Sequence, residues 1–317
     1  MMALGLRTIF LLGLATLVGA AGSVLRRDHQ GQVAALQSIR QATEQACAIK
    51  SAVHQSPIED PPAVGPSNGS LVIGGGGTLD TVIWKRFLEL AGGPEAPIVI
   101  VPTASSFADR YCSTDDCPAV KVLRSVGAKN VSVVHTNDRD VADSDEFVAP
   151  LKRARGVWIT GGNQWRLVAA YIGTQTQRAL AGVLDRGGVI GGTSAGATIQ
   201  GVFASFPGRG ATPYEPGFGF LRNVAIDQHL LARHRENDLV HVVRDHPDLL
   251  GIGIDEATAV IVQDDCMDVV GDSKVAIYDP TYHGDDDERP YYFLSPGDRF
   301  NLRTRTDMRD EESADGR

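Results

Sequence analysis

The chain has 317 residues, of which 43% are hydrophobic, and this is enough for one large globular domain or two small ones. Its formal net charge is -9. Because binding to a nucleic-acid backbone rests on clustered Lys and Arg, this acidic balance argues against a DNA or RNA partner.

The first 23 residues have the order of an export signal. Arg7 precedes an apolar run over residues 9–18, and small residues follow that run. A membrane anchor is the alternative, but residues 8–21 are short for a bilayer span of roughly 20 residues. The sequence therefore predicts an exported protein, periplasmic or extracellular, with a signal over residues 1–23.

Residues 24–68 are expected to form a short amphipathic helix and then a linker rich in Pro, Gly and Ser. The chain has four cysteines, an even number in a protein expected to reach an oxidising compartment. Cys112 and Cys117 suit a loop disulfide better than a metal site, because no histidine or further cysteine is near them. Free thiols are the alternative for these two and for Cys47 and Cys266.

From Leu71 onward, short apolar runs alternate with amphipathic stretches. Strands are expected over 71–77, 97–104, 130–135, 156–160 and 188–194, and helices over 79–91, 118–128, 144–154 and 164–186. Continuous apolar strands separated by helices are typical of a parallel sheet that is covered on both faces. The sequence therefore predicts a doubly wound α/β domain, with a mostly parallel sheet, over residues 69–302.

Beyond Ser194 the alternation gives way to strands. These are expected over 225–230, 251–263, 266–271 and 274–279, with one helix near 237–245. This pattern predicts a partly antiparallel C-terminal edge of the sheet. The acidic run 285–288 indicates a solvated loop, since it lacks the spaced oxygen ligands of a calcium site. Residues 303–317 are charged and without apolar periodicity, which predicts a disordered tail.

Ser194 lies in the small-residue stretch 187–201, where a buried strand ends and a helix-compatible run begins. The pattern Gly192-Thr-Ser194-Ala-Gly196 predicts a nucleophile elbow, a tight turn that projects the hydroxyl outward and leaves no room for neighbouring side chains. A helix start at Ala195 would also place its N–H near a developing oxyanion. Because the chain is rich in glycine, the motif alone is weak, and a plain helix-start serine is the alternative.

The glycine run Gly74–Gly77 follows the first strand of the domain and could bring its backbone close to a substrate. The N–H groups of Gly75 and Gly76 are therefore the candidates for the second oxyanion donor. A dinucleotide loop is the alternative, but G-x-G-x-x-G fails at Leu79, and no P-loop lysine follows.

A serine hydroxyl needs a base, and that base needs an acid to fix its tautomer. His229 is the preferred base, because it closes an apolar strand and stands beside charged and polar residues. Asp255 and Glu256 begin the next strand and are the candidates for the acid. An α/β-hydrolase would run nucleophile, acid, base along the chain, and would have to use His283 with Asp255 or Asp264.

Six motifs in this order resemble the cyanophycinase family of serine peptidases, which is related to the aspartyl dipeptidases: IGGGG, VPTAS, ITGGNQ, GGTSAGA, IDQH...R.R and GIDEATA. The resemblance covers about residues 70–279. It implies a class I glutamine amidotransferase-like fold with serine in place of a cysteine nucleophile. The implied nucleophile is Ser194, the base His229 and the acid Glu256, which agrees with the choice made from the residues.

The resemblance also implies substrate contacts, and in cyanophycinases these positions hold a β-aspartyl-arginine unit: Gln164, Asp227, Gln228, Arg233 and Arg235. The chain departs from cyanophycin-cleaving members at two places. Asp238 stands where they carry a third arginine, and Gly77 and Thr78 stand where they have an acidic residue. Reversing a charge in a recognition cluster is expected to alter ligand preference.

The sequence thus predicts an exported serine peptidase that hydrolyses a β-aspartyl isopeptide bond, or a peptide bond at an acidic residue, through an acyl-enzyme. The expected partner is a peptide or polypeptide substrate such as cyanophycin or a β-aspartyl dipeptide. No cofactor, metal or nucleic acid is implied, and a homodimer is left open. The alternatives are a catalytically silent amidotransferase-like binding protein and an α/β-hydrolase-type esterase.

Overall fold

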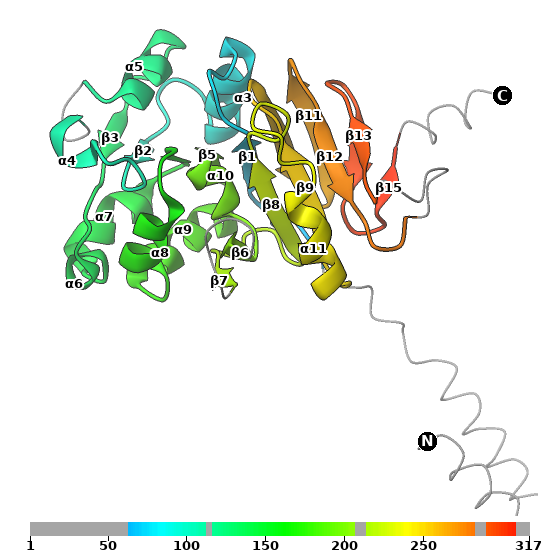
Figure 1. Ribbon diagram of the computed structural model, residues 1–317. Coiled ribbons are helices and arrows are strands. Elements are labelled where there is room, and N and C mark those ends of the chain that lie inside the picture. Colours follow the sequence, from blue (N-terminus) through cyan, green and yellow to red (C-terminus); the bar gives the residue numbers. More distant parts are fainter. Residues whose placement is uncertain (1–62, 112–115, 207–213, 283–289, 309–317) are drawn as a thin grey trace, which may run out of the picture. The chain divides into compact units, whose positions relative to one another are not determined.

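A nine-stranded sheet organises the part of the chain that the computed structural model describes (Figure 1). The described residues are 63–111, 116–206, 214–282 and 290–308. Across the sheet the strands are β15 (Thr306–Asp307), β14 (Arg299–Asn301), β11 (Cys266–Gly271), β10 (Thr258–Gln263), β1 (Ser70–Gly74), β5 (Val189–Thr193), β4 (Gly156–Ile159), β2 (Ile98–Val101) and β3 (Val131–Val133).

Strands β1, β5, β4, β2 and β3 run parallel, and β10, β11, β14 and β15 add to them in antiparallel pairs. This confirms the predicted fold class, an α/β sheet with an antiparallel C-terminal edge. The helices are α3 (Thr81–Ala91), α4 (Ala108–Tyr111), α5 (Pro118–Ser125), α6 (Arg139–Ala142), α7 (Asp145–Arg153), α8 (Gln164–Tyr171), α9 (Gln175–Asp185), α10 (Ala195–Thr198) and α11 (Asp238–Asp245).

Helices cover both faces of the parallel half of the sheet. In Figure 1, α3 and α5 lie at the top of the view, and α7, α8 and α9 lie at the bottom. On β1, the Val72 side chain packs with α3 and α5, whereas Leu71 and Ile73 pack with α7 to α9. Successive side chains of a strand point to opposite faces, so a strand that is apolar at every position is stable only between two layers.

A second sheet of four strands packs on the antiparallel half of the first. Its order is β13 (Tyr292–Leu294), β12 (Val275–Tyr278), β9 (Leu250–Ile254) and β8 (Val224–Gln228), in which β8 and β9 are parallel. One face packs against the large sheet, as Ile252 does, and the other face is covered by α11 through Leu239 and Val242. The remaining pair is β6 (Phe203–Ser205) with β7 (Glu215–Pro216).

The structure corrects three predicted elements. The helix expected over 164–186 is two helices, because Gly173 adopts a left-handed φ of 76° and ends the first. The strand run 251–263 is divided between β9 and β10, which belong to different sheets. Residues 303–308, expected to belong to the disordered tail, include β15, which pairs with Phe300 and Asn301 of β14, and the rest of the expected tail lies outside the described residues.

The strand that leads to Ser194 is held by close aromatic packing. A Cβ at Gly191 would lie 2.3 Å from the indole ring of its paired residue Trp158, so glycine at this position leaves the space that the indole occupies. The ring centroids of Trp84 and Trp158 are 4.1 Å apart, and Phe87 meets Trp158 edge-on at 5.1 Å. This cluster fixes α3 against the strands on which the site is built.

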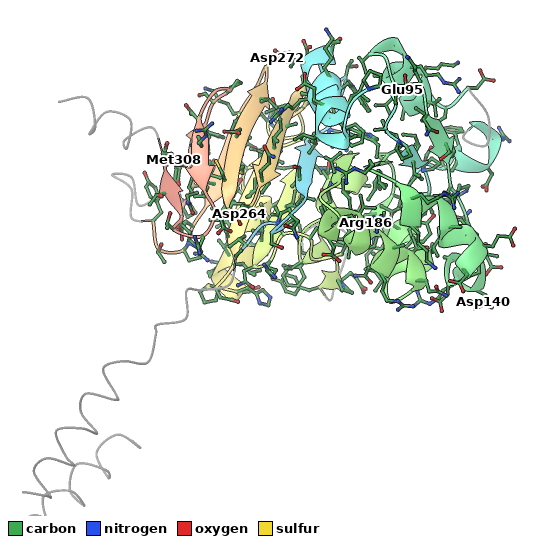
Figure 2. The ribbon with its side chains drawn as sticks, turned by 180° about the vertical axis from the view of Figure 1, so that it is seen from behind. Glu95, Asp140, Arg186, Asp264, Asp272 and Met308 are labelled. Carbon is green, nitrogen blue, oxygen red and sulfur yellow. The ribbon has the colours of Figure 1, made fainter. Side chains whose placement is uncertain are left out.

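Charged side chains such as Glu95, Asp140 and Asp272 lie at the surface, as the view from behind shows (Figure 2). In the described ranges, no helix has the length and apolar character that a membrane crossing requires. The predictions for the export signal and the acidic run 285–288 lie outside the described residues. So do Cys47 and Cys112, and the disulfide between Cys112 and Cys117 stays a prediction.

Candidate active site

Ser194 occupies a strained turn between β5 and α10. Its φ is 55° and its ψ is -115°, a backbone conformation that residues with a side chain rarely adopt. A Cβ at Gly192 would lie 2.2 Å from the carbonyl oxygen of Gly196, and one at Gly196 would lie 2.1 Å from that of Ile159. The flanking glycines are therefore a steric requirement of the turn.

Three side chains from separate loops meet at this turn. The Oγ of Ser194 lies 2.9 Å from Nε2 of His229, and Nδ1 of His229 lies 2.5 Å from Oε1 of Glu256. If Nδ1–H donates to the carboxylate, Nε2 is left to accept the serine proton. The arrangement is a hydroxyl, an imidazole and a carboxylate in the order that nucleophilic catalysis needs.

The glycine loop after β1 holds the three segments together through its backbone. Its successive carbonyl oxygens accept one N–H from each segment: Gly74 from Ser194 at 3.0 Å, Gly75 from His229 at 2.9 Å and Gly76 from Ala257 at 3.0 Å. A Cβ at Gly76 would lie 2.2 Å from Cε1 of His229. The loop needs glycine because the catalytic segments pass directly over it.

The same backbone corrects one predicted oxyanion donor. The N–H of Gly75 donates to the carbonyl oxygen of Thr258 at 2.9 Å, so it is occupied within the sheet. The N–H groups of Gly76 and Ala195 have no acceptor among the described residues. Ala195 is the first residue of α10, where N–H groups lack an intrahelical partner. Gly76 and Ala195 remain the candidate donors.

His229 is 5% exposed, and its surroundings favour the neutral ring. Burial lowers the pKa of His229 below its ordinary value of 6.5, and the positive charges of Arg233 and Arg235 act in the same direction. The hydrogen bond to Glu256 opposes this shift without reversing it. The imidazole is therefore unprotonated and able to accept a proton at neutral pH.

The polar residues at the end of β8 form a cluster beside His229. Nη1 of Arg235 donates to the backbone oxygen of Gln228 at 3.0 Å and to its side-chain oxygen at 3.2 Å, and it lies 3.9 Å from Asp227. Asp227 and Gln228 are 1% and 4% exposed. These two predicted substrate residues thus hold Arg235 in place, and the exposed Arg233 is the cation that faces solvent next to His229.

The structure gives the other two recognition positions no hydrogen bond to a described side chain of the triad. Gln164 is the first residue of α8 and makes no hydrogen bond with the described side chains of the triad. Asp238 begins α11, and its N–H donates to the Arg235 carbonyl oxygen at 2.9 Å. Throughout the described ranges, no three His, Cys, Asp or Glu side chains gather as a metal site.

Asp255 has a role that the sequence did not reveal. Its Oδ1 accepts the N–H groups of Leu231 and Ala232, both at 2.9 Å, and its Oδ2 accepts the Ser273 hydroxyl at 2.6 Å. Burial raises the pKa of Asp255, but these hydrogen bonds outweigh it and lower the pKa below its usual value. Asp255 therefore anchors the turn that follows His229. The signal in the sequence was a carboxylate beside Glu256 within an apolar run, which indicates a buried group that needs hydrogen-bond partners.

The geometry disfavours the acids of the α/β-hydrolase alternative. Asp255 is occupied by backbone N–H groups, and the exposed Asp264 follows the end of β10 that is remote from Glu256. His283 lies outside the described residues. The carboxylate that contacts the His229 ring is Glu256.

Comparison with known proteins gives a consistent result. Residues 70–270 match peptidase family S51, and this range contains all three residues of the triad. A cyanophycinase from Synechococcus elongatus is 34% identical over 260 residues, which are 74% of this chain and 80% of that protein. A cyanophycinase from Nostoc sp. is 33% identical over 263 residues, 73% of this chain and 85% of that protein.

A solved structure shares the fold. The crystal structure of a peptidase from an acI-B1 Actinobacterium superposes with a TM-score of 0.60 at 25% sequence identity, over 75% of this chain and 98% of that chain. The similarity extends over nearly the whole of that peptidase.

Replacing Asp255 is expected to destabilise the fold. Asp255→Ala loses three hydrogen bonds to a charged acceptor and leaves two backbone N–H groups unpaired, which should lower the free energy of unfolding by about 2–4 kcal/mol. Urea unfolding at neutral pH measures this free energy for the wild type and the variant. Asp272→Ala, an exposed carboxylate nearby, is the control and should change it by less than about 0.5 kcal/mol.

The effect of Asp255 should depend on pH. Because its folded-state pKa is lowered, its contribution is present above the unfolded pKa of about 4 and is lost as pH falls through the folded value. The stability difference between the wild type and Asp255→Ala should therefore shrink in acid. A difference that stays constant into strong acid would contradict the anchoring role.

The pKa of His229 should respond to Arg233. Removing that positive charge in Arg233→Gln should raise the pKa of His229, so the acid limb of Ser194 labelling by a fluorophosphonate should move to higher pH. The rate of labelling as a function of pH measures the shift. Arg153→Gln removes an exposed arginine of α7 and should leave the pH midpoint of labelling unchanged. If the midpoint moves equally in both variants, the charge of Arg233 has no specific effect on the pKa of His229.

Proposed function

The chain belongs to peptidase family S51 and is a serine-type peptidase, and we propose that it hydrolyses a β-aspartyl isopeptide bond or a peptide bond at an acidic residue. The observation that carries the proposal is the continuous contact from Ser194 through His229 to Glu256, at 2.9 and 2.5 Å. A buried, unprotonated imidazole between a strained serine and a carboxylate has the properties of a general base.

The proposed reaction passes through an acyl-enzyme. His229 Nε2 takes the proton of Ser194 while Oγ attacks the carbonyl carbon, and the oxyanion accepts N–H groups of Ala195 and Gly76. The imidazolium, stabilised by Glu256, then gives its proton to the leaving amine as the C–N bond breaks. Water, deprotonated by His229, attacks the ester, and the proton returns to Ser194 as the acid product leaves.

The charge beside the triad supports an acidic residue in the substrate. Arg233 is exposed next to His229, and Arg235 is held at the end of β8 by Gln228, so both can meet a carboxylate of the substrate. The relatives are named cyanophycinases, which makes cyanophycin or a β-aspartyl dipeptide the first candidate. Asp238, whose N–H donates to the backbone oxygen of Arg235, adds a negative charge that would repel a second anionic group.

Loss of the nucleophile should abolish the activity. Ser194→Ala should remove both fluorophosphonate labelling and the turnover of cyanophycin and β-aspartyl-arginine, because no other group can form the acyl-enzyme in this scheme. Release of dipeptide, followed by chromatography, measures turnover. Ser132→Ala, an exposed serine of β3, is the control and should retain both.

Two outcomes would contradict this assignment. Turnover retained by Ser194→Ala would mean that another residue is the nucleophile. A wild-type protein that is not labelled, but whose melting temperature rises with ligand, would instead be the catalytically silent binding protein.

Export is part of the proposal, because residues 1–23 have the order of a secretory signal. Protein recovered from the periplasm or the medium should begin near residue 23, as N-terminal sequencing would show. A full-length chain that keeps its first residues and stays in the cytoplasm would contradict export without touching the catalytic assignment.

A further inference from the structure

A cavity of about 570 Å³ lies beside the triad, on the face of the sheet that α3 and α5 cover. Thr193, the residue before the nucleophile, lines it, and so does Gly161, where a Cβ would lie 3.6 Å from the Ser194 Oγ. Gly77 lines it too, and a Cβ there would lie 2.8 Å from Oε2 of Glu256. Residues that adjoin the reacting groups therefore form part of the cavity's lining.

The lining of this cavity, here called the α3–α5 pocket, is largely apolar. Leu79 and Trp84 come from the start of α3 and the residues before it, Trp158 from β4, and Val122 and Val126 from the end of α5. The polar members are Ser and Thr hydroxyls, and no lining residue is Asp, Glu, Lys or Arg. A volume of this size takes a large side chain with room for the adjoining backbone.

Among the described residues, no carboxylate lines the pocket. Glu256 pairs with His229 at 2.5 Å, and Asp116, next in sequence to the lining residue Cys117, is exposed and lies 3.1 Å from Lys121. Asp80 caps α3 by accepting the N–H of Val82 at 2.8 Å. A guanidinium in the pocket would leave water without a carboxylate among the described lining residues to pair with, whereas an apolar side chain would gain from leaving water.

We propose that the α3–α5 pocket binds an uncharged apolar or aromatic side chain of the substrate residue that is bonded to the acidic residue. This proposal rests on the proposed function, and it assigns the two substrate residues to opposite surroundings. The acidic residue meets Arg233 and Arg235, neither of which lines the pocket, and its neighbour enters the pocket. The peptidase would then prefer aspartyl-leucine and aspartyl-phenylalanine bonds over aspartyl-arginine bonds.

Matched dipeptides test the preference. Aspartyl-leucine, aspartyl-phenylalanine and aspartyl-arginine, each in α and β linkage, should differ in kcat/KM by about tenfold or more in favour of the two apolar partners. Val122→Glu places a carboxylate in the pocket from a half-buried position of α5, and should reduce this ratio about tenfold by admitting arginine. Val141→Glu, an exposed residue of α6 outside the pocket, is the matched control and should keep the wild-type ratio.

Two further measurements keep the result decisive. Ser125→Asp adds a carboxylate from an exposed lining position, so it replaces Val122→Glu if that variant does not fold. Calorimetry with Ser194→Ala measures the affinity of the pocket for the same dipeptides in the absence of hydrolysis. Fluorophosphonate labelling of each variant that keeps Ser194 measures the reactivity of this serine independently of dipeptide binding in the pocket.

The outcomes separate the two proposals. An aspartyl-arginine preference in the wild type, or a ratio unchanged in a variant that still labels at the normal rate, overturns the pocket and leaves the peptidase assignment standing. Absence of labelling and turnover, with the binding order apolar over arginine retained, overturns the proposed function and supports the pocket.

Discussion

The backbone of the glycine loop after β1 is the constraint on which the site depends. Three consecutive carbonyl oxygens, of Gly74, Gly75 and Gly76, each accept an N–H from a segment that carries or adjoins one triad residue. These hydrogen bonds use backbone atoms alone. The loop can accept them only if it carries no side chains that would hold the three segments away. A Cβ at Gly75 would lie 2.1 Å from the Asp255 oxygen. The glycines therefore allow the segments of the triad to approach the loop backbone, a role apart from contact with the substrate.

The bonds from the loop stabilise a site that is locally unfavourable. Ser194 and His229 both adopt a positive φ, at 55° and 56°, and each such residue costs on the order of 1–3 kcal/mol. Asp255 adds three hydrogen bonds to the turn that follows His229. Since both strained residues follow buried strands, the apolar layers around those strands fix where the turns begin. Reactive geometry is thus maintained by backbone bonds and packing together.

Much of the fold and the chain order of the triad could be predicted from the sequence. Strands that are apolar at every position require cover on both faces, which is visible in composition alone. The division of residues 251–263 between two sheets could not be predicted from the sequence. Both β9 and β10 are apolar, and the chain changes direction at Ala257, with φ of 55°. The break between α8 and α9 depends on one glycine within an otherwise helical pattern. The role of Asp255 depends on residues 18 to 24 positions away.

The charges around the triad connect substrate binding to the strength of the base. Burial lowers the pKa of His229 most, and the charges of Arg233 and Arg235 lower it further, which favours a neutral imidazole but also makes it a weaker base. In the proposed reaction an acidic residue of the substrate approaches these same arginines, and its carboxylate offsets their charge. The part of the lowering of the His229 pKa that comes from the two arginines is then reduced, while the part that comes from burial remains. The α3–α5 pocket has no charged residue in its described lining, so it adds no charge that would oppose this change.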